Sequence, residues 1–264
     1  MIDIHHHLLF GLDDGSPDIE TSVAMVEMAA EDGITHIVCT PHANHRYHFD
    51  PAINRQLLEE LRQQVKGKVT LGLGCDFHLS FDNIEDCLEN RTKYTINQKD
   101  YLLVEFADLV IPQSMTEAFY EMKVAGLHPI ITHPERNQTI QRHPHRMTEW
   151  LRGGCLVQVT ASSLTGRFGR AAQAMAFDYL DKNWVHFIAS DAHNLTSRPP
   201  VISEAYKVIA NKYGKETAER LCVSNPRAAF EGAPFPAQPE MAGLYEDREP
   251  RPKGLLGRLF SFAK

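Results

Sequence analysis

The sequence lacks several features that would assign it to a specialised class of protein. Its five cysteines are odd in number and form no C-x-x-C pair, which excludes a disulfide framework and a zinc ribbon. No apolar run approaches the ~18 residues that a membrane-spanning helix needs. Positive charge is in deficit, with 27 lysines and arginines against 34 acidic residues, which argues against nucleic-acid binding. The chain opens without the charged and apolar regions of a signal peptide, so we expect a cytoplasmic protein.

Histidine, by contrast, is abundant. The chain has 14 histidines, against 13 phenylalanines and 8 tyrosines. Apolar residues make up 43% of the chain and charged residues 23%, ordinary values for a protein with a full hydrophobic core. The length suits one barrel-sized α/β domain or two smaller ones. The placement of the histidines is therefore the feature that can indicate a function.

Short β-rich runs alternate with helical patterns along the first 230 residues or so. The clearest helix follows cap residues at 16–18, has apolar residues at three- and four-residue spacing, and ends at Gly33. Strands begin about every 30 residues, the length of one βα unit, and their continuous apolar runs are typical of a parallel sheet. We expect one α/β domain over residues 1–232, a closed or nearly closed barrel, with an open doubly wound sheet as the alternative. The expected strands are 2–7, 35–40, 69–75, 101–106, 128–132, 155–160 and 185–190, and the other helices are 53–65, 82–89, 114–125, 146–152, 168–182, 201–212, 215–222 and 226–231.

Residue types that bind metals stand where these strands end, which is where a βα barrel carries its chemistry. His5 and His7 are two apart on one strand and therefore point to the same face. Asp191 and His193 repeat that spacing after the last strand. A single histidine at a strand end is usually only hydrogen-bonded, but most of the strands place an acid or a histidine there. The candidate ligands are His5, His7, Asp14, His42, Asp76, Glu105, His133, Asp191 and His193.

This set of nitrogen and oxygen ligands is too large for one ion and suits two or three divalent cations. Imidazole and carboxylate without thiolate favour manganese, iron or zinc. Three such ions would outweigh the carboxylates and attract an anion such as a phosphomonoester, whose hydrolysis metal clusters promote. Arg136 and Arg198 lie close to candidate ligands in the sequence. Their guanidinium groups either bind phosphate or form surface ion pairs.

Nine short motifs follow one another in a fixed order. They are D-I-H-x-H at 3–7, D-D-G at 13–15, T-P-H at 40–42, V-E-F at 104–106, T-H-P-E-R at 132–136, A-S-D-A-H-N at 189–194, R-P-P at 198–200, E-A-Y at 204–206 and N-P-R at 225–227. Together they resemble the PHP (polymerase and histidinol phosphatase) superfamily over about residues 1–232. More closely, they resemble its bacterial tyrosine-protein phosphatases encoded with capsular and exopolysaccharide systems.

The resemblance implies a distorted (β/α)7 barrel with a trinuclear metal site, commonly manganese-dependent. Asp76 stands where this branch usually has the longer Glu, so two or three ions are expected. The implied reaction is direct attack of metal-bound hydroxide on phosphotyrosine, with Asp14, Arg136 and Arg198 as catalytic residues and the two arginines binding the phosphate. The implied substrate is the tyrosine-rich tail of a membrane-associated autokinase that controls polysaccharide polymerisation. The implied ligand sets are His5, His7, Asp76 and Asp191 for the first ion, Asp76, Glu105 and His133 for the second, and Asp14, His42 and His193 for the third.

Other activities fit these residues less well or remain open. No cysteine has an arginine six residues after it, which excludes a cysteine-based tyrosine phosphatase. An amidohydrolase usually has a lysine where this chain has Glu105, and an eighth βα unit. The acidic net charge of −7 disfavours a nuclease. A histidinol-phosphatase or another small-molecule phosphatase would use the same metal chemistry, and a metal-holding scaffold bound to the kinase is a further alternative.

Two segments have no assigned role. The polar and aromatic loop at 43–48 either binds a phosphotyrosine ring or an acidic peptide, or is solvated. Residues 233–264 are rich in proline and predict a flexible tail that ends in a basic and apolar segment from Lys253. That segment either touches an anionic membrane or the kinase, or docks on its own barrel or on a neighbouring subunit. Membrane contact would place the protein at the inner face of the membrane.

Overall fold

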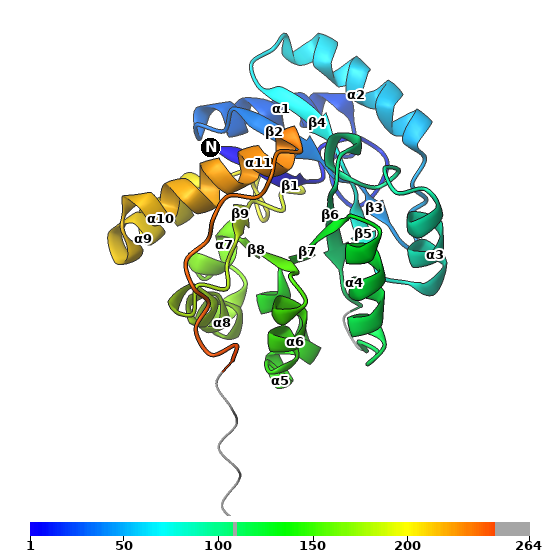
Figure 1. Ribbon diagram of the computed structural model, residues 1–264. Coiled ribbons are helices and arrows are strands. Elements are labelled where there is room, and N and C mark those ends of the chain that lie inside the picture. Colours follow the sequence, from blue (N-terminus) through cyan, green and yellow to red (C-terminus); the bar gives the residue numbers. More distant parts are fainter. Residues whose placement is uncertain (108–109, 246–264) are drawn as a thin grey trace, which may run out of the picture.

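A computed structural model describes residues 1–107 and 110–245. Seven parallel strand positions follow one another around the molecule in chain order, with helices outside them (Figure 1). One sheet has the order β1 (Ile2–His6), β2 (His36–Cys39) and β4 (Thr70–Leu73). The other has the order β3 (His42–Ala43), β5 (Asp76–His78), β6 (Tyr101–Glu105), β7 (His128–Thr132), β8 (Leu156–Thr160) and β9 (Phe187–Ala189).

The second and third strand positions are each divided in two. Pro41 has no N–H to donate to the ladder, and it separates β2 from β3. The backbone N–H of Gly74 donates to the carbonyl of Cys39 at 2.8 Å, and that of Asp76 to the carbonyl of Pro41 at 3.2 Å. The pieces therefore stay in register, with His42 directly opposite Asp76 in the β3–β5 pair. The interruption thus puts two candidate ligands side by side.

The last strand returns to the first and closes the ring. His6 and Ala192 form a parallel bridge, and the backbone N–H of Asp191 donates to the carbonyl of His5 at 2.9 Å. Asp3, which is fully buried, accepts from the backbone N–H of Ser190 at 3.0 Å. The expected seven-stranded barrel is confirmed, and the open doubly wound sheet is not the observed arrangement.

The helices agree with the expected ones to within a few residues. Asp18 caps the first helix by accepting from the backbone N–H of Thr21 at 2.8 Å. Four short elements were not expected, because one helical turn is too short to show a periodic pattern: η1 (Ile96–Gln98), η2 (Pro134–Arg136), α5 (Gln138–Arg142) and α7 (Ala161–Leu164). The others are α1 (Ile19–Glu31), α2 (Pro51–Val65), α3 (Phe81–Glu89), α4 (Met115–Val124), α6 (Arg146–Arg152), α8 (Gly169–Asp181), α9 (Ser203–Tyr213), α10 (Lys215–Glu219), the π-helix η3 (Arg220–Ser224) and α11 (Asn225–Glu231).

Buried apolar side chains fill the barrel beneath the C-terminal ends of its strands, where the candidate ligands lie. A compact cluster that includes Tyr101, Leu103 and Ile130 fills the barrel interior. Along β6, Tyr101, Leu103 and Glu105 alternate onto the same face, because successive side chains of a strand point to opposite sides. The same strand face that builds the interior therefore presents a carboxylate at its C-terminal end.

Residues 232–245 pack against the barrel, although the sequence predicts a flexible tail from residue 233. The hydroxyl of Tyr101 donates to the carbonyl of Ala233 at 2.8 Å, and the indole N–H of Trp184 donates to the carbonyl of Ala242 at 2.9 Å. These side-chain bonds hold an irregular backbone that has no sequence periodicity. In Figure 1 the segment runs from α11 toward the end of α8. The basic and apolar end of the chain lies outside the described residues.

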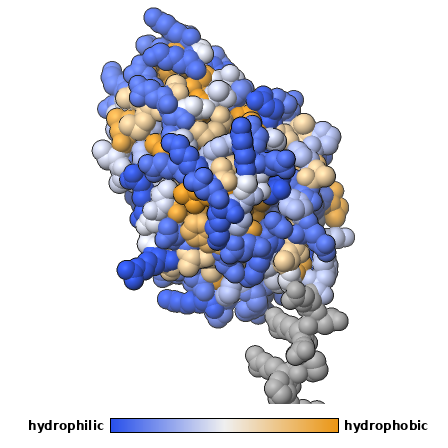
Figure 2. Space-filling model, turned by 90° about the vertical axis from the view of Figure 1, so that its left-hand side faces the viewer, coloured by the Kyte–Doolittle hydropathy of each residue, from blue (hydrophilic) through white to orange (hydrophobic). Residues whose placement is uncertain are grey.

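The face formed by α8, α9 and α10 is mostly hydrophilic, with apolar side chains in small separate areas (Figure 2). No helix in the described part of the chain has the length and apolarity that crossing a bilayer requires.

Candidate metal centre

All nine candidate ligands lie together at the C-terminal ends of the strands. Several of them border a cavity of about 220 Å³, and His5, His7 and His193 are buried directly beneath it. A larger hollow of about 750 Å³ beside α6 brings together no comparable group of ligand atoms among the described residues. The cavity is lined by Asp14, His42, Asp76, Glu105, Phe106, Thr132, His133, Arg136, Asn137, Asp191 and Arg198.

The first group of ligand atoms joins the start and the end of the barrel. Nε2 of His5 lies 3.4 Å from Oδ2 of Asp76 and 3.4 Å from Oδ1 of Asp191. Nε2 of His7 lies 3.4 Å from the same oxygen of Asp191 and 4.0 Å from Oδ2 of Asp76. Ligand atoms about 2.1 Å from one ion stand roughly 3 to 3.5 Å apart. The spacing of these four side chains is therefore close to that of a common ion.

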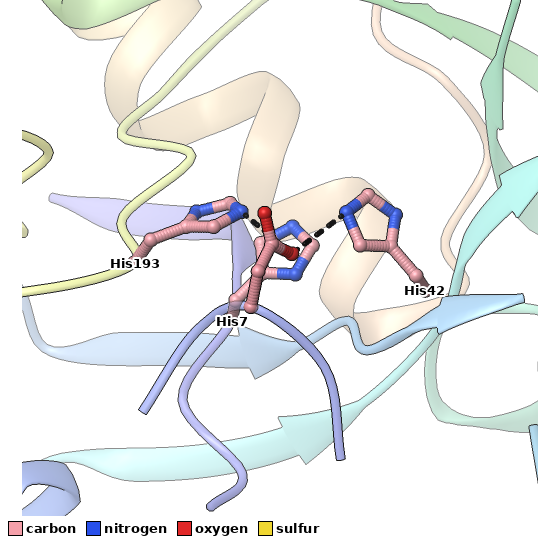
Figure 3. Close-up of side chains that lie close together, drawn as sticks. His7, His42 and His193 are labelled. Carbon is pink, nitrogen blue, oxygen red and sulfur yellow. Dashed lines mark ion pairs between the residues drawn. The ribbon is translucent and has the colours of Figure 1, made fainter. Parts of the chain in front are cut away.

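A second group surrounds the carboxylate of Asp14. In Figure 3, the imidazole rings of His193 and His42 lie at the two ends of this group, and the ring of His7 lies between them. Oδ1 of Asp14 lies 3.4 Å from Nε2 of His42 and 3.7 Å from Nε2 of His193. Asp14 is the exposed member, with 53% of its side chain accessible, whereas 3% of the His193 side chain is accessible. This group therefore opens directly to solvent.

Asp76 connects the groups. Its Oδ2 atom, which faces His5, also lies 3.2 Å from Nδ1 of His42. The same nitrogen of His42 is 3.6 Å from Oε2 of Glu105, and Oε1 of Glu105 is 3.7 Å from Nε2 of His133. Potential ligand atoms also group His42 with Asp76 and Glu105, and His133 with His5 and Asp191. These groupings are additional to the ligand sets that the family resemblance implies.

The electrostatics of the cluster fit a site for cations. Burial alone would raise the pKa of Asp76, but the nearby His5 and His42 hold it well below its ordinary value. Burial alone would lower the pKa of His5, but Asp191 and Asp76 raise it to about 9. In the part of the chain that the structure describes, both carboxylate oxygens of Asp76, Nδ1 of His42 and Nε2 of His193 are buried without a hydrogen-bond partner. An unsatisfied buried group costs about 1–3 kcal/mol, and divalent ions would satisfy all four atoms.

Two residues that the sequence analysis missed orient the histidines. Oδ2 of Asp13 accepts from Nδ1 of His7 at 2.8 Å and from the backbone N–H of His42 at 3.0 Å. Oε1 of Gln158, on β8, accepts from Nδ1 of His5 at 2.9 Å. With Nδ1 as the donor, each Nε2 is left as an acceptor facing the cluster. Asp13 could have been identified from the D-D-G motif, in which it precedes the candidate ligand Asp14. Gln158 lies inside a buried strand and belongs to none of the motifs.

The loop after β1 depends on a glycine. The backbone N–H of Ser16 donates to the carbonyl of His7 at 3.2 Å, so the loop folds back onto the strand. A Cβ atom on Gly15 would lie only 2.3 Å from that carbonyl oxygen. Gly15 also donates its backbone N–H to Oδ1 of Asp13 at 2.9 Å. Only glycine permits the approach that places Asp13 beside His7.

Both candidate arginines reach the cluster and are not surface ion pairs. Arg136, on η2, and Arg198, in the loop after β9, both donate to Oδ2 of Asp191, whose Oδ1 faces His5 and His7. The side chains of Arg136 and Arg198 are 22% and 24% accessible, and both line the cavity. The lining of the cavity therefore contains two guanidinium groups as well as carboxylates.

The loop at 43–48 also reaches this region. The ring of Tyr47 stacks on that of His42, with centroids 5.8 Å apart and planes 12° apart. Asn137 lines the cavity and accepts from the backbone N–H of Ile140 at 3.1 Å as the cap of α5. Phe106 completes the wall. Neither Asn137 nor Phe106 was expected, because neither belongs to a metal-binding residue type.

Comparison with known proteins gives concordant matches over most of the chain. The family model for capsular polysaccharide synthesis, CpsB/CapC, matches residues 1–231. CapC of Staphylococcus aureus is 37% identical over 210 residues, covering 78% of this chain and 82% of that protein. The tyrosine-protein phosphatase YwqE of Bacillus subtilis is 34% identical over 220 residues, covering 82% of this chain and 86% of that protein.

Solved structures agree with these matches. A crystal structure from the pair YwqE of Bacillus subtilis and CpsB of Streptococcus pneumoniae, described as unique metal-dependent tyrosine phosphatases, has a TM-score of 0.86 and 31% identity. That match covers 91% of this chain and 98% of the other. A histidinol phosphate phosphatase of Lactococcus lactis shares only the fold, with 12% identity and a TM-score of 0.53. The family model spans the whole barrel, and these relatives match over most of the chain. The chain therefore belongs to the CpsB/CapC family of capsular polysaccharide synthesis.

Proposed function

We propose that the chain is a metal-dependent hydrolase of protein phosphotyrosine. The observation that carries this proposal is the convergence of nine imidazole and carboxylate side chains, with two arginines beside them, at and directly beneath one cavity. The relatives named as tyrosine-protein phosphatases, one of them described as metal-dependent, support it. The site has no cysteine nucleophile, because all five cysteines are buried and none lines the cavity.

The proposed cofactor is two or three divalent ions, with manganese the expected metal and iron or zinc the alternatives. Imidazole and carboxylate donors without thiolate suit these metals. Asp76 would be the shared ligand, since its Oδ2 atom lies 3.4 Å from Nε2 of His5 and 3.2 Å from Nδ1 of His42. The proposed ligands are His5, His7, Asp14, His42, Asp76, Glu105, His133, Asp191 and His193.

The protein's own groups would each have a distinct task. Divalent ions, when bound, lower the pKa of a water that attacks phosphorus and clamp phosphate oxygens. Arg136 and Arg198 would bind the remaining phosphate oxygens and stabilise the negative charge of the transition state. The hydrogen bond with His42 lowers the pKa of Asp14, so this residue stays ionised and acts as an acceptor at the mouth. Asn137 and Phe106 would limit the entry of further water.

The proposed substrate is a tyrosine autokinase of capsular or exopolysaccharide synthesis, phosphorylated on its tail. Membership of a capsular-synthesis family supports this choice. A kinase of that kind at the membrane would bring the phosphatase to the inner face of the membrane from the cytoplasm. The alternative, a small-molecule phosphatase such as a histidinol-phosphatase, would use the same ligands and differ only in the groups around the cavity mouth.

The decisive experiment removes metal with a chelator, restores manganese, and compares hydrolysis of a phosphotyrosine peptide with that of histidinol phosphate. We expect manganese-dependent turnover that favours the peptide. His5→Ala and Asp191→Ala should abolish it, whereas the matched substitutions His145→Ala and Asp82→Ala, at exposed positions outside the cluster, should not.

Three results would change the proposal. Preference for histidinol phosphate would keep the site and move the substrate to amino-acid metabolism. Turnover that does not respond to chelation would refute the metal mechanism. No turnover of either substrate, with manganese binding intact, would refute the phosphatase assignment and favour a metal-holding scaffold.

A further inference from the structure

A short turn with the sequence G-R-F-G-R, residues 166–170, touches the wall of the cavity. Phe168 stacks against Arg136, whose Cζ atom lies 4.1 Å from the centre of the phenyl ring. Arg136 in turn lines the cavity. Phe168 is half-buried, whereas Arg167 and Arg170 are exposed. Because consecutive Cα atoms are ~3.8 Å apart, both exposed arginines begin within two residues of the side chain that contacts the wall.

The shape of this turn is fixed by its backbone. Gly166 and Gly169 both have a φ of +85°, a conformation that favours glycine. The backbone N–H of Gly169 donates to the carbonyl of Gly166 at 3.0 Å, and that of Arg167 to the carbonyl of Ser162 at 3.0 Å. With the stacked phenyl ring, these bonds hold the turn in one place beside the cavity. The two exposed guanidinium groups therefore start from a defined position.

The charge of this turn is not neutralised by an ion pair among the described residues. Within the described ranges neither Arg167 nor Arg170 forms an ion pair, although Glu204 borders the same small hollow as Arg167. Residues 161–177 contain no acidic side chain, in a chain whose net charge is −7. Asp14, with 53% of its side chain exposed, also lines the cavity. The surroundings of the cavity therefore include both exposed cationic side chains and an exposed carboxylate.

We infer that the turn at 166–170, here called the arginine turn, binds acidic side chains that flank the phosphotyrosine of the protein substrate. The inference rests on the proposed function and adds a preference for sequence. When Arg136 and Arg198 hold the phosphate, the residues next to the tyrosine remain at the mouth, spaced ~3.3 Å apart along an extended peptide. Acidic neighbours are attracted to the exposed guanidinium groups of the arginine turn, so this turn favours substrates with acidic residues beside the phosphotyrosine.

The test measures binding and catalysis with two peptides that differ only in acidic or neutral residues around the phosphotyrosine. Binding is followed by fluorescence anisotropy on manganese-loaded protein, with a non-hydrolysable phosphonate in place of the phosphate. The variant Arg167→Gln/Arg170→Gln is compared with Arg55→Gln/Lys215→Gln, which removes the same charge from exposed positions on α2 and α10. The variant Arg167→Lys/Arg170→Lys keeps the charge.

We expect wild type to bind the acidic peptide more tightly than the neutral one. The glutamine variant should weaken only the acidic peptide, by about three- to tenfold, as expected for two exposed ion pairs. The effect should fall on KM and not on kcat, should shrink at ~1 M salt, and should leave hydrolysis of p-nitrophenyl phosphate unchanged. The lysine and Arg55/Lys215 variants should behave like wild type.

Equal affinity of wild type for the two peptides would overturn the inference, and so would an equal loss in both double charge-removal variants. Loss of p-nitrophenyl phosphate hydrolysis in the arginine-turn variant would show a general effect on the site and would also overturn it. If wild type hydrolysed no phosphate ester but bound the acidic phosphonate peptide selectively, the proposed function would fail and the arginine turn would stand as a binding surface.

Discussion

Asp13 offers the sharpest test of how this site is built, because it touches the candidate ligands without belonging to the cluster itself. Its carboxylate accepts three hydrogen bonds, from His7 Nδ1 at 2.8 Å, from the backbone N–H of His42 at 3.0 Å and from that of Gly15 at 2.9 Å. In Asp13→Asn the oxygen can keep the first two donors, but the amide nitrogen must then face the N–H of Gly15. The least disruptive arrangement therefore loses one bond and the negative charge behind His7.

A hydrogen bond to a charged group contributes about 1.5–3 kcal/mol, which corresponds to roughly 10- to 100-fold in an equilibrium constant. Loss of a carboxylate behind a metal-binding histidine typically costs 10–100-fold in affinity or activity, so the two estimates agree. We expect Asp13→Asn to weaken manganese affinity by that factor and to reduce kcat/KM at subsaturating metal. Asp13→Ala should lose more, because it leaves all three donors unpaired.

The assay is a manganese titration of chelator-treated protein by calorimetry, with activity measured in parallel. The control is Asp18→Asn, which changes an exposed carboxylate in the neighbouring helix cap. Wild-type metal affinity and activity in Asp13→Asn would refute the reasoning that this carboxylate sets the orientation and basicity of His7.

Three further predictions address the phosphate clamp, the protonation of the cluster and the loop glycine. Arg198→Gln should lower kcat/KM for a phosphotyrosine peptide by about 10- to 100-fold, because it removes a charged donor to the phosphate, and should change metal affinity less, since Arg136 still donates to Oδ2 of Asp191. In metal-free protein, Asp191 and its neighbours outweigh the effect of burial and raise the pKa of His5 from 6.5 to about 9. The folded state then binds more protons than the unfolded state, so the free energy of unfolding should fall as pH rises from about 6.5 to about 9, measured by urea denaturation after chelation. Gly15→Ala should cost about 1–3 kcal/mol in urea denaturation and weaken metal binding, since its Cβ would displace the carbonyl of His7.

Each of these has a matched check. Arg142→Gln, at an exposed position outside the cavity, should keep full activity, and equal losses in the two arginine variants would argue against a phosphate clamp. The pH slope should flatten in His5→Gln, and a stability that rises between pH 6.5 and 9 would contradict the assigned protonation. Gly67→Ala adds a Cβ in open space at a φ of +75°, so it measures the cost of backbone strain alone, whereas Gly15 has no positive φ and its substitution measures the cost of the collision.

The sequence by itself determined the repeated strand and helix, because each unit has its own apolar pattern and cap residues. It also determined which side chains lie at the C-terminal ends of the strands. The two-residue spacings of His5 and His7 and of Asp191 and His193 follow directly from strand geometry. These local rules were sufficient to predict that the nine candidate ligands would meet around one cavity.

Only the tertiary structure decided how these groups pair. The closure of β9 onto β1 brings Asp191 beside His5, and the break at Pro41 sets His42 opposite Asp76. The hydrogen bond between Gln158 and His5 joins residues 153 positions apart, and no local pattern can indicate such a contact. Residues 232–245 lack periodicity, and they pack on the barrel because side chains such as Trp184 satisfy their carbonyl groups. Strand and helix patterns are local, whereas the partners of a buried polar atom depend on which distant elements the closed barrel brings together.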